Sequence, residues 1–221
     1  MQFHGVPNAY SESGIDLTQL RRNLRLTLED RWCANLHGLS LCRELQRARR
    51  GPFHRDSIMA DFDAPRILQE LQGQQVEFVL IGGLAMIAHG SAYVTNDLDI
   101  CYARSATNVD AVARALTPLH PYLRGVPPGL PFVLDAPTIQ AGLNFTLVTD
   151  AGDLDLFGHV PGVGDHAQAL AQSEACTIFG MTVQILTLDG LIAAKTAAGR
   201  PKDKLHLLEL DELKKLRDVQ P

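Results

Sequence analysis

The stretch Ile81-Gly82-Gly83-Leu84-Ala85, followed by Asn96-Asp97-Leu98-Asp99-Ile100, decides the fold class of this chain. The apolar residues Val76 and 78–81 predict a short buried strand that ends at the two glycines. The second stretch continues into apolar residues and predicts another strand. Because successive side chains of a strand point to opposite faces, Asp97 and Asp99 share one face. The sequence therefore predicts an α/β fold with two carboxylates on one face of a sheet.

This pair of carboxylates indicates metal chemistry. The Cα atoms of residues i and i+2 in a strand lie about 7 Å apart, and carboxylates at that spacing can hold divalent cations about 3.5–4 Å apart. Oxygen ligands of this kind suit Mg²⁺ or Mn²⁺. The ordinary alternative is a turn in which Asn96 and Asp97 bond their own backbone. The apolar residues Leu98 and Ile100 favour the strand, and with it a metal-dependent phosphoryl-transfer site.

The glycine pair is expected to bind phosphate. Residues 84–89 predict a helix that ends at Gly90. A helix that begins directly after Gly82-Gly83 presents free backbone N–H groups and the positive end of its dipole, which suit the phosphates of a nucleotide. Glycines between a strand and a helix also serve ordinary packing. Their position just before the aspartate pair leads us to assign Gly82 and Gly83 to nucleotide binding.

A third carboxylate is expected from Gly152-Asp153-Leu154-Asp155-Leu156-Phe157. Residues 144–149 predict a strand, and residues 154–160 predict its antiparallel partner after a tight turn. Asp153 and Asp155 share a face. An ionised carboxylate between apolar neighbours, such as Asp155, is costly unless a cation compensates it. Asp155 is therefore the expected third metal ligand, and Asp153 is the alternative.

A fourth block, residues 188–210, predicts two helices. Leu188 and Leu191 begin an apolar stripe, and Lys195 follows on the same helix before the break at 199–201. A second helix is expected from about Lys202, with Asp203 in its first turn, where a negative charge suits the helix dipole. From these residues alone, Lys195 is a solvated side chain and Asp203 a capping charge.

Taken together, four segments resemble the nucleotidyltransferases of the DNA polymerase β superfamily, specifically the small bacterial group that includes the AbiE-type abortive-infection toxins. The segments are IGGLAMIAHG (81–90), TNDLDI (95–100), GDLDLFG (152–158) and LDGLIAAKTAAGRPKDKLHLLEL (188–210). The resemblance implies a polymerase β-like fold, with a mixed twisted sheet, helices on one face and C-terminal helices. It implies that Asp97, Asp99 and Asp155 hold Mg²⁺, that Lys195 contacts nucleotide phosphates, and that Arg200 and Asp203 lie at the same site.

The same resemblance implies the reaction and the partners. The expected enzyme moves a nucleoside monophosphate from a nucleoside triphosphate to an acceptor hydroxyl on RNA, at the 3′ end of tRNA, as the toxin of a toxin–antitoxin pair with a cognate antitoxin protein. A small-molecule, antibiotic-modifying nucleotidyltransferase and a catalytically silent nucleotide-binding module are the alternatives. The chain departs from the family pattern at Gly83, Tyr93 and His206, where relatives carry Ser, Arg and an acidic residue.

Composition limits the setting of this protein. The chain has 221 residues, of which 46% are hydrophobic, enough for one good core. No signal peptide or membrane span is expected, because the longest uncharged apolar run, residues 78–88, is too short. Four cysteines without paired metal spacing suggest a reducing cytoplasm.

The N-terminal 58 residues differ in charge from the rest. They hold nine Arg and no Lys against six acidic residues, whereas residues 59–221 carry a net charge of −8. We therefore expect an Arg-rich, poorly ordered extension over 1–58 and the nucleotidyltransferase domain over 59–221, with a nucleic-acid-binding arm as the less favoured alternative. The Pro- and Gly-rich residues 118–131 predict a long loop that rims the active site.

Overall fold

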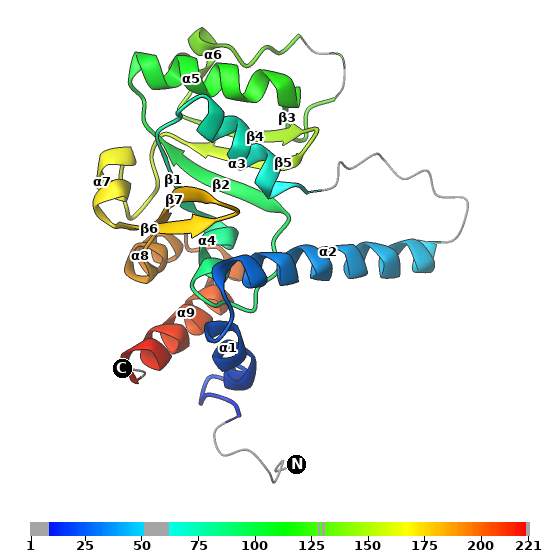
Figure 1. Cartoon of the computed structure of the whole chain (residues 1–221), viewed down its shortest axis with the longest axis vertical. Coiled ribbons are helices and arrows are strands. Elements are labelled where there is room, and N and C mark those ends of the chain that lie inside the picture. Colours follow the sequence, from blue (N-terminus) through cyan, green and yellow to red (C-terminus); the bar gives the residue numbers. More distant parts are fainter. Residues whose placement is uncertain (1–8, 51–61, 128, 130, 220–221) are drawn as a thin grey trace.

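The computed structural model describes residues 9–50, 62–127, 129 and 131–219. It is an α/β structure in which a mixed sheet lies between groups of helices (Figure 1). The strands are β1 (Phe78–Ile81), β2 (Asp97–Tyr102), β3 (Tyr122–Leu123), β4 (Asn144–Thr149), β5 (Gly152–Phe157), β6 (Ser173–Ile178) and β7 (Met181–Leu186). The α-helices are α1 (Leu17–Leu24), α2 (Leu28–Arg50), α3 (Ala64–Gly73), α4 (Gly82–Ala88), α5 (Ala106–Leu116), α6 (Ala136–Ala141), α7 (His166–Ala171), α8 (Leu188–Ala198) and α9 (Pro201–Val219).

Among the described residues, seven strands form one sheet in the order β3-β4-β5-β2-β1-β7-β6. Strand β1 is antiparallel to β2 and parallel to β7, and β2 is parallel to β5. The expected hairpin is confirmed, because β4 and β5 pair antiparallel across a turn at residues 150–151. The central position of β2 matters most for function, since it brings its aspartates beside those of β5.

Alternation along β2 explains how one strand serves both the core and the site. Leu98, Ile100 and Tyr102 are fully buried, whereas Asp97 and Asp99 retain partial exposure on the other face. Since apolar burial stabilises a fold by about 25 cal/mol per Å², the apolar face anchors the strand. The anchored strand then holds the carboxylates in place.

The helices lie around both ends of the sheet and also against its central strands, where α4 and α7 contact β1 and β2. In Figure 1, α3, α5 and α6 lie around the β3–β5 end, whereas α1, α8 and α9 lie on the opposite side, below β6 and β7. Helix α4 lies between the strand that carries Asp97 and Asp99 and the helix that carries Lys195, because it contacts β1 and β2 as well as α8. In the part of the chain that the structure describes, no helix combines the length and apolar character needed to cross a bilayer.

The described part of the N-terminal segment, residues 9–50, contains helices α1 and α2, which pack on the rest of the protein. Leu20 and Trp32 are 1% exposed and belong to the main hydrophobic core. Arg31 donates hydrogen bonds to the carbonyls of Asn23 and Ala88, and so links the N-terminal helices to the end of α4. This packing differs from the expectation of a poorly ordered extension, because the leucines and the single tryptophan supply an apolar face that the charge count ignores. The expected boundary at residues 58 and 59 lies outside the described residues.

The stretch 118–131 is not a loop throughout. Its described part contains strand β3, which extends the sheet by pairing with β4. Two residues are enough for an edge strand, and prolines are tolerated on either side of it because an edge has one row of backbone groups without a ladder partner. Arg124 follows this short strand directly in the sequence.

Candidate functional site

Three carboxylates converge where β2 lies beside β5. In the parallel register, Asp99 is opposite Asp155 and Asp97 is opposite Asp153. Ligand oxygens from Asp97, Asp99 and Asp155 all lie within 4.8 Å of one another, the spacing of groups that can hold a metal ion. The structure therefore brings together the three aspartates expected as metal ligands, from two strands that are far apart in the sequence.

The environment of Asp99 disfavours its negative charge. Burial, followed by the charges of Asp97 and Asp155, raises the pKa of Asp99 to about 7, and the charge of Lys195 only partly offsets these effects. A group of carboxylates without enough positive charge either keeps a proton or binds a cation. These three residues thus fit Mg²⁺ or Mn²⁺ in both ligand chemistry and electrostatics.

The glycine pair is shaped by the protein's own side chains. Gly82 has φ +66°, and a Cβ atom there would lie 1.8 Å from Oδ2 of Asp99. A Cβ atom on Gly83 would lie 2.6 Å from Oγ1 of Thr95. The backbone N–H of Gly83 also bonds the Asp99 carboxylate and lowers its pKa. Both glycines are therefore required so that Asp99 and Thr95 can approach the start of α4, a reason separate from the expected phosphate binding.

Arg124 is a site residue that sequence reasoning missed. Its Nη2 donates to Oδ1 of Asp155 at 2.7 Å, and its Nε lies 3.2 Å from Oδ2 of Asp153. Burial raises the pKa of Asp155 to about 6 despite this guanidinium, and the charge of Asp97 adds to the effect. Arg124 is the only Lys, Arg, Asp or Glu between Thr117 and Leu134. This isolated charge in a Pro- and Gly-rich stretch was the feature of the sequence that could have indicated a site residue. Asp153 serves as an ion-pair partner of Arg124 and lies outside the three-carboxylate group.

A second cluster joins α8 to α9 around Asp203, which is 0% exposed. Lys195, 8% exposed, places its Nζ 3.4 Å from Oδ1 of Asp203, and Nε of Arg200 donates to Oδ2 at 2.7 Å. Burial alone would raise the pKa of Asp203, but the bond from Arg200 and the charge of Lys195 outweigh it and lower the pKa to about 2. Asp203 thus holds two cations in place and is itself shielded from any ligand.

The two clusters act on each other. The carboxylate of Asp99 affects the pKa of both Lys195 and Arg200, so the cations lie within electrostatic range of the metal-binding group. The structure therefore brings Lys195, Arg200 and Asp203 to the same region as the two glycines at the start of α4 and the aspartates. Carboxylates can bind a metal ion, and the neighbouring cations can bind phosphate. A substrate that consists of a phosphate with its metal ion needs both groups side by side.

Tyr93 and His206, two of the departures from the family pattern, meet in space. Their rings are edge to face with centroids 4.4 Å apart. Burial, and then the charges of Asp97 and Asp99, raise the pKa of Tyr93. Burial and the charge of Lys195 lower the pKa of His206 to about 4. A neutral aromatic pair therefore connects the loop before β2 to α9, beside both charged clusters.

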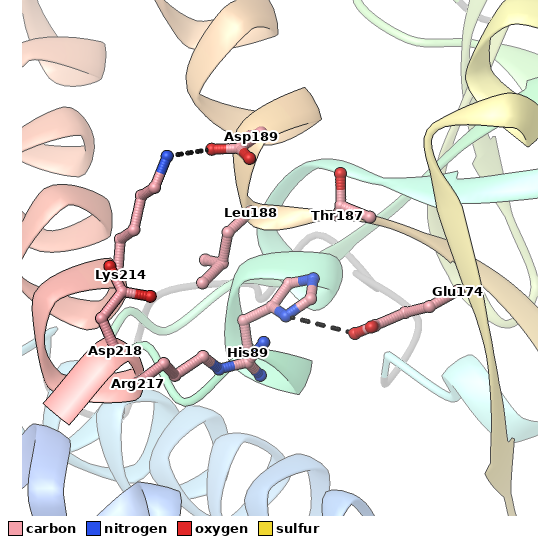
Figure 2. A pocket seen from close by; sticks show the side chains of 8 residues that line it. All are labelled: His89, Glu174, Thr187, Leu188, Asp189, Lys214, Arg217 and Asp218. Carbon is pink, nitrogen blue, oxygen red and sulfur yellow. Dashed lines mark hydrogen bonds and ion pairs between the residues drawn. The ribbon is translucent and has the colours of Figure 1, made fainter. Parts of the chain in front are cut away.

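A separate cavity of about 210 Å³ lies at the end of α4, between β6, α8 and α9 (Figure 2). His89 lines this cavity, and its Nε2 bonds the carbonyl oxygen of Leu186 at 2.8 Å, while its Nδ1 lies 3.6 Å from Glu174. Lys214 pairs with Asp189 on the rim. None of the three converging aspartates lines this cavity, so His89 connects helix to sheet and does not complete the metal-binding group.

Comparison with models of known protein families found no match, and comparison with curated proteins found no match either.

Proposed function

We propose that this protein is a metal-dependent nucleotidyltransferase with a polymerase β-like fold. The observation that carries the proposal is the convergence of Asp97, Asp99 and Asp155, with their oxygens within 4.8 Å of one another. These carboxylates follow the two glycines at the start of α4, and the cations Lys195 of α8 and Arg200, just before α9, lie within electrostatic range of them. All of these residues belong to the four sequence segments that carry the family resemblance.

Each group has a distinct role in this proposal. Asp97, Asp99 and Asp155 would hold Mg²⁺ or Mn²⁺, which when bound would supply Lewis-acid stabilisation of phosphate charge. Lys195 and Arg200 attract the triphosphate of the nucleotide. The acceptor hydroxyl, deprotonated near Asp155, attacks the α-phosphate in line, and pyrophosphate leaves.

The proposed acceptor is RNA, at the 3′ end of tRNA. The proposal rests here on the resemblance to AbiE-type toxins, which also implies a cognate antitoxin protein as partner. RNA binding depends on Lys and Arg contacts to phosphates. The exposed residues Lys202 and Lys204, in the first turn of α9 beside Arg200, favour such contacts.

The test is a labelling experiment. The full chain is incubated with each α-³²P-labelled nucleoside triphosphate, Mg²⁺ and either total RNA or a panel of aminoglycosides and lincosamides. We expect label in RNA of tRNA size, its loss in Asp99→Ala, and its retention in Asp110→Asn, which changes an exposed acid on α5. Label in a small molecule would preserve the chemistry and replace the acceptor.

A catalytically silent nucleotide-binding module is the second candidate. It is favoured by Arg124, whose guanidinium already compensates part of the charge of Asp153 and Asp155. Under this alternative, the protein binds nucleoside triphosphate but transfers label to neither pool.

A further inference from the structure

We propose that Asn35 of α2 is a positioning residue for the metal-binding aspartates, acting through Thr95 on Asp97. This inference rests on the proposed function, because it concerns the same site. It assigns a role in the site to the N-terminal helices, which contribute none of the residues expected there from the sequence.

Asn35 holds the backbone of Thr95 from two sides. Its Nδ2 donates to the carbonyl oxygen of Thr95 at 2.9 Å, and its Oδ1 accepts from the N–H of Thr95 at 2.9 Å. The two residues are 4% and 5% exposed, so water does not compete for these bonds. A paired amide contact of this kind fixes the orientation of the Thr95 backbone as well as its position.

Thr95 transmits this constraint to the site. Its hydroxyl donates a hydrogen bond to Oδ1 of Asp97, which restricts rotation of that carboxylate. The same side chain packs against Gly83, where a Cβ atom would lie 2.7 Å from Cβ of Thr95. Asn35 therefore fixes a residue that contacts both a metal-binding carboxylate and Gly83 at the start of α4. Hydrogen-bonding partners of this indirect kind orient metal ligands and affect metal affinity.

A second asparagine provides the matched control. Asn23 of α1 also connects the N-terminal helices to this loop, since its Nδ2 bonds the carbonyl oxygens of Gly90 and Ser91 at 3.2 and 3.1 Å. These contacts do not involve Thr95 or Asp97. If the asparagines only fastened the N-terminal segment to the domain, the two alanine variants would have the same effect on the metal site.

The experiment is calorimetric titration of the full chain with Mn²⁺, together with thermal melting of each variant. We expect Asn35→Ala to weaken Mn²⁺ binding by about 10- to 100-fold, the usual effect of losing such a partner. Asn23→Ala should lower Tm while leaving the Mn²⁺ affinity unchanged. Thr95→Val, which keeps both backbone bonds to Asn35, should weaken Mn²⁺ binding, and Thr95→Ser, which keeps the hydroxyl, should restore it.

The outcomes separate this inference from the proposed function. Unchanged Mn²⁺ affinity in a folded Asn35→Ala protein, or in Thr95→Val, would overturn the positioning role alone. Mn²⁺ binding with the expected variant pattern but no nucleotide transfer would overturn the proposed function and leave the positioning role supported. Absence of Mn²⁺ binding to the unaltered chain would overturn both.

Discussion

Asp99 and Asp203 are both shielded carboxylates in neighbouring clusters, but they ionise in opposite ways. The pKa of Asp99 is raised to about 7 by burial and by two other aspartates, whereas the pKa of Asp203 is lowered to about 2 because Arg200 and Lys195 outweigh its burial. Burial is the largest cause of the raised pKa of Asp99, whereas at Asp203 the neighbouring cations together outweigh burial and lower the pKa. The aspartate cluster of β2 and β5 lacks enough positive charge to balance it, whereas the cluster around Asp203 contains its own cations.

This difference assigns opposite ligand preferences to the two clusters. The aspartates of β2 and β5 favour a cation, which would relieve their mutual repulsion. The α8–α9 cluster keeps two cations in fixed positions, of which Arg200 is about half exposed and able to meet an anion. A nucleoside triphosphate with its bound Mg²⁺ presents both kinds of charge at once.

Removing Asp203 should have the largest effect on stability. Asp203→Ala leaves Lys195 buried without its partner, and breaking a buried ion pair from one side costs about 3–5 kcal/mol. We expect the urea midpoint to fall markedly in equilibrium unfolding. Asp189→Ala, which breaks the exposed pair with Lys214, is the control and should leave the midpoint nearly unchanged. A small effect of Asp203→Ala would show that the second cluster is not held together by this carboxylate.

Neutralising Asp99 should change the free energy of unfolding in the opposite direction, and by less. Its folded pKa of about 7 lies above its ordinary value near 3.8, so the unfolded chain releases this proton first as pH rises, and stability is lost between about pH 4 and 7. Asp99→Asn should therefore stabilise the metal-free protein at pH 8, by on the order of 1–3 kcal/mol. The gain should vanish toward pH 4, as measured by Tm across a pH series. A constant difference at all pH values would contradict the raised pKa.

The smallest expected effect concerns Arg124. Asp99 and Asp155 must lose protons to bind a metal, so Mn²⁺ affinity should rise with pH from about 5.5 to 7.5. Arg124→Gln removes the cation that partly offsets the burial of Asp155, so the pKa of Asp155 should rise further. The Mn²⁺ binding profile, measured by calorimetry at several pH values, should then shift to higher pH by about half a unit or more.

Two results would change this view of the first cluster. A Mn²⁺ affinity independent of pH would mean that the aspartates bind without releasing protons. A shift of the Arg124→Gln profile to lower pH would mean that the guanidinium acts mainly by ordering the site rather than by its charge.

Local patterns in the sequence determined the elements that carry the site. Strand β4 begins and ends at the predicted residues, 144 and 149. The apolar residues after Asp97 predicted strand β2, and the two-residue period of a strand is enough to place Asp97 and Asp99 on one face. The break expected at residues 199–201 likewise indicated the boundary between α8, which ends at Ala198, and α9, which begins at Pro201. Such features depend only on neighbours along the chain, so a single sequence contains them.

The tertiary structure alone decided which distant residues meet. The parallel register of β2 and β5 brings Asp155 opposite Asp99, and the two-residue strand β3 brings Arg124 to Asp155. The contact between Asn35 and Thr95 depends on where α2 packs. Hydrophobic periodicity says that a face is buried but not which surface covers it, and a charge count says nothing about pairing. Strand order and helix packing fix those partners, and the partners set the charge state of each carboxylate.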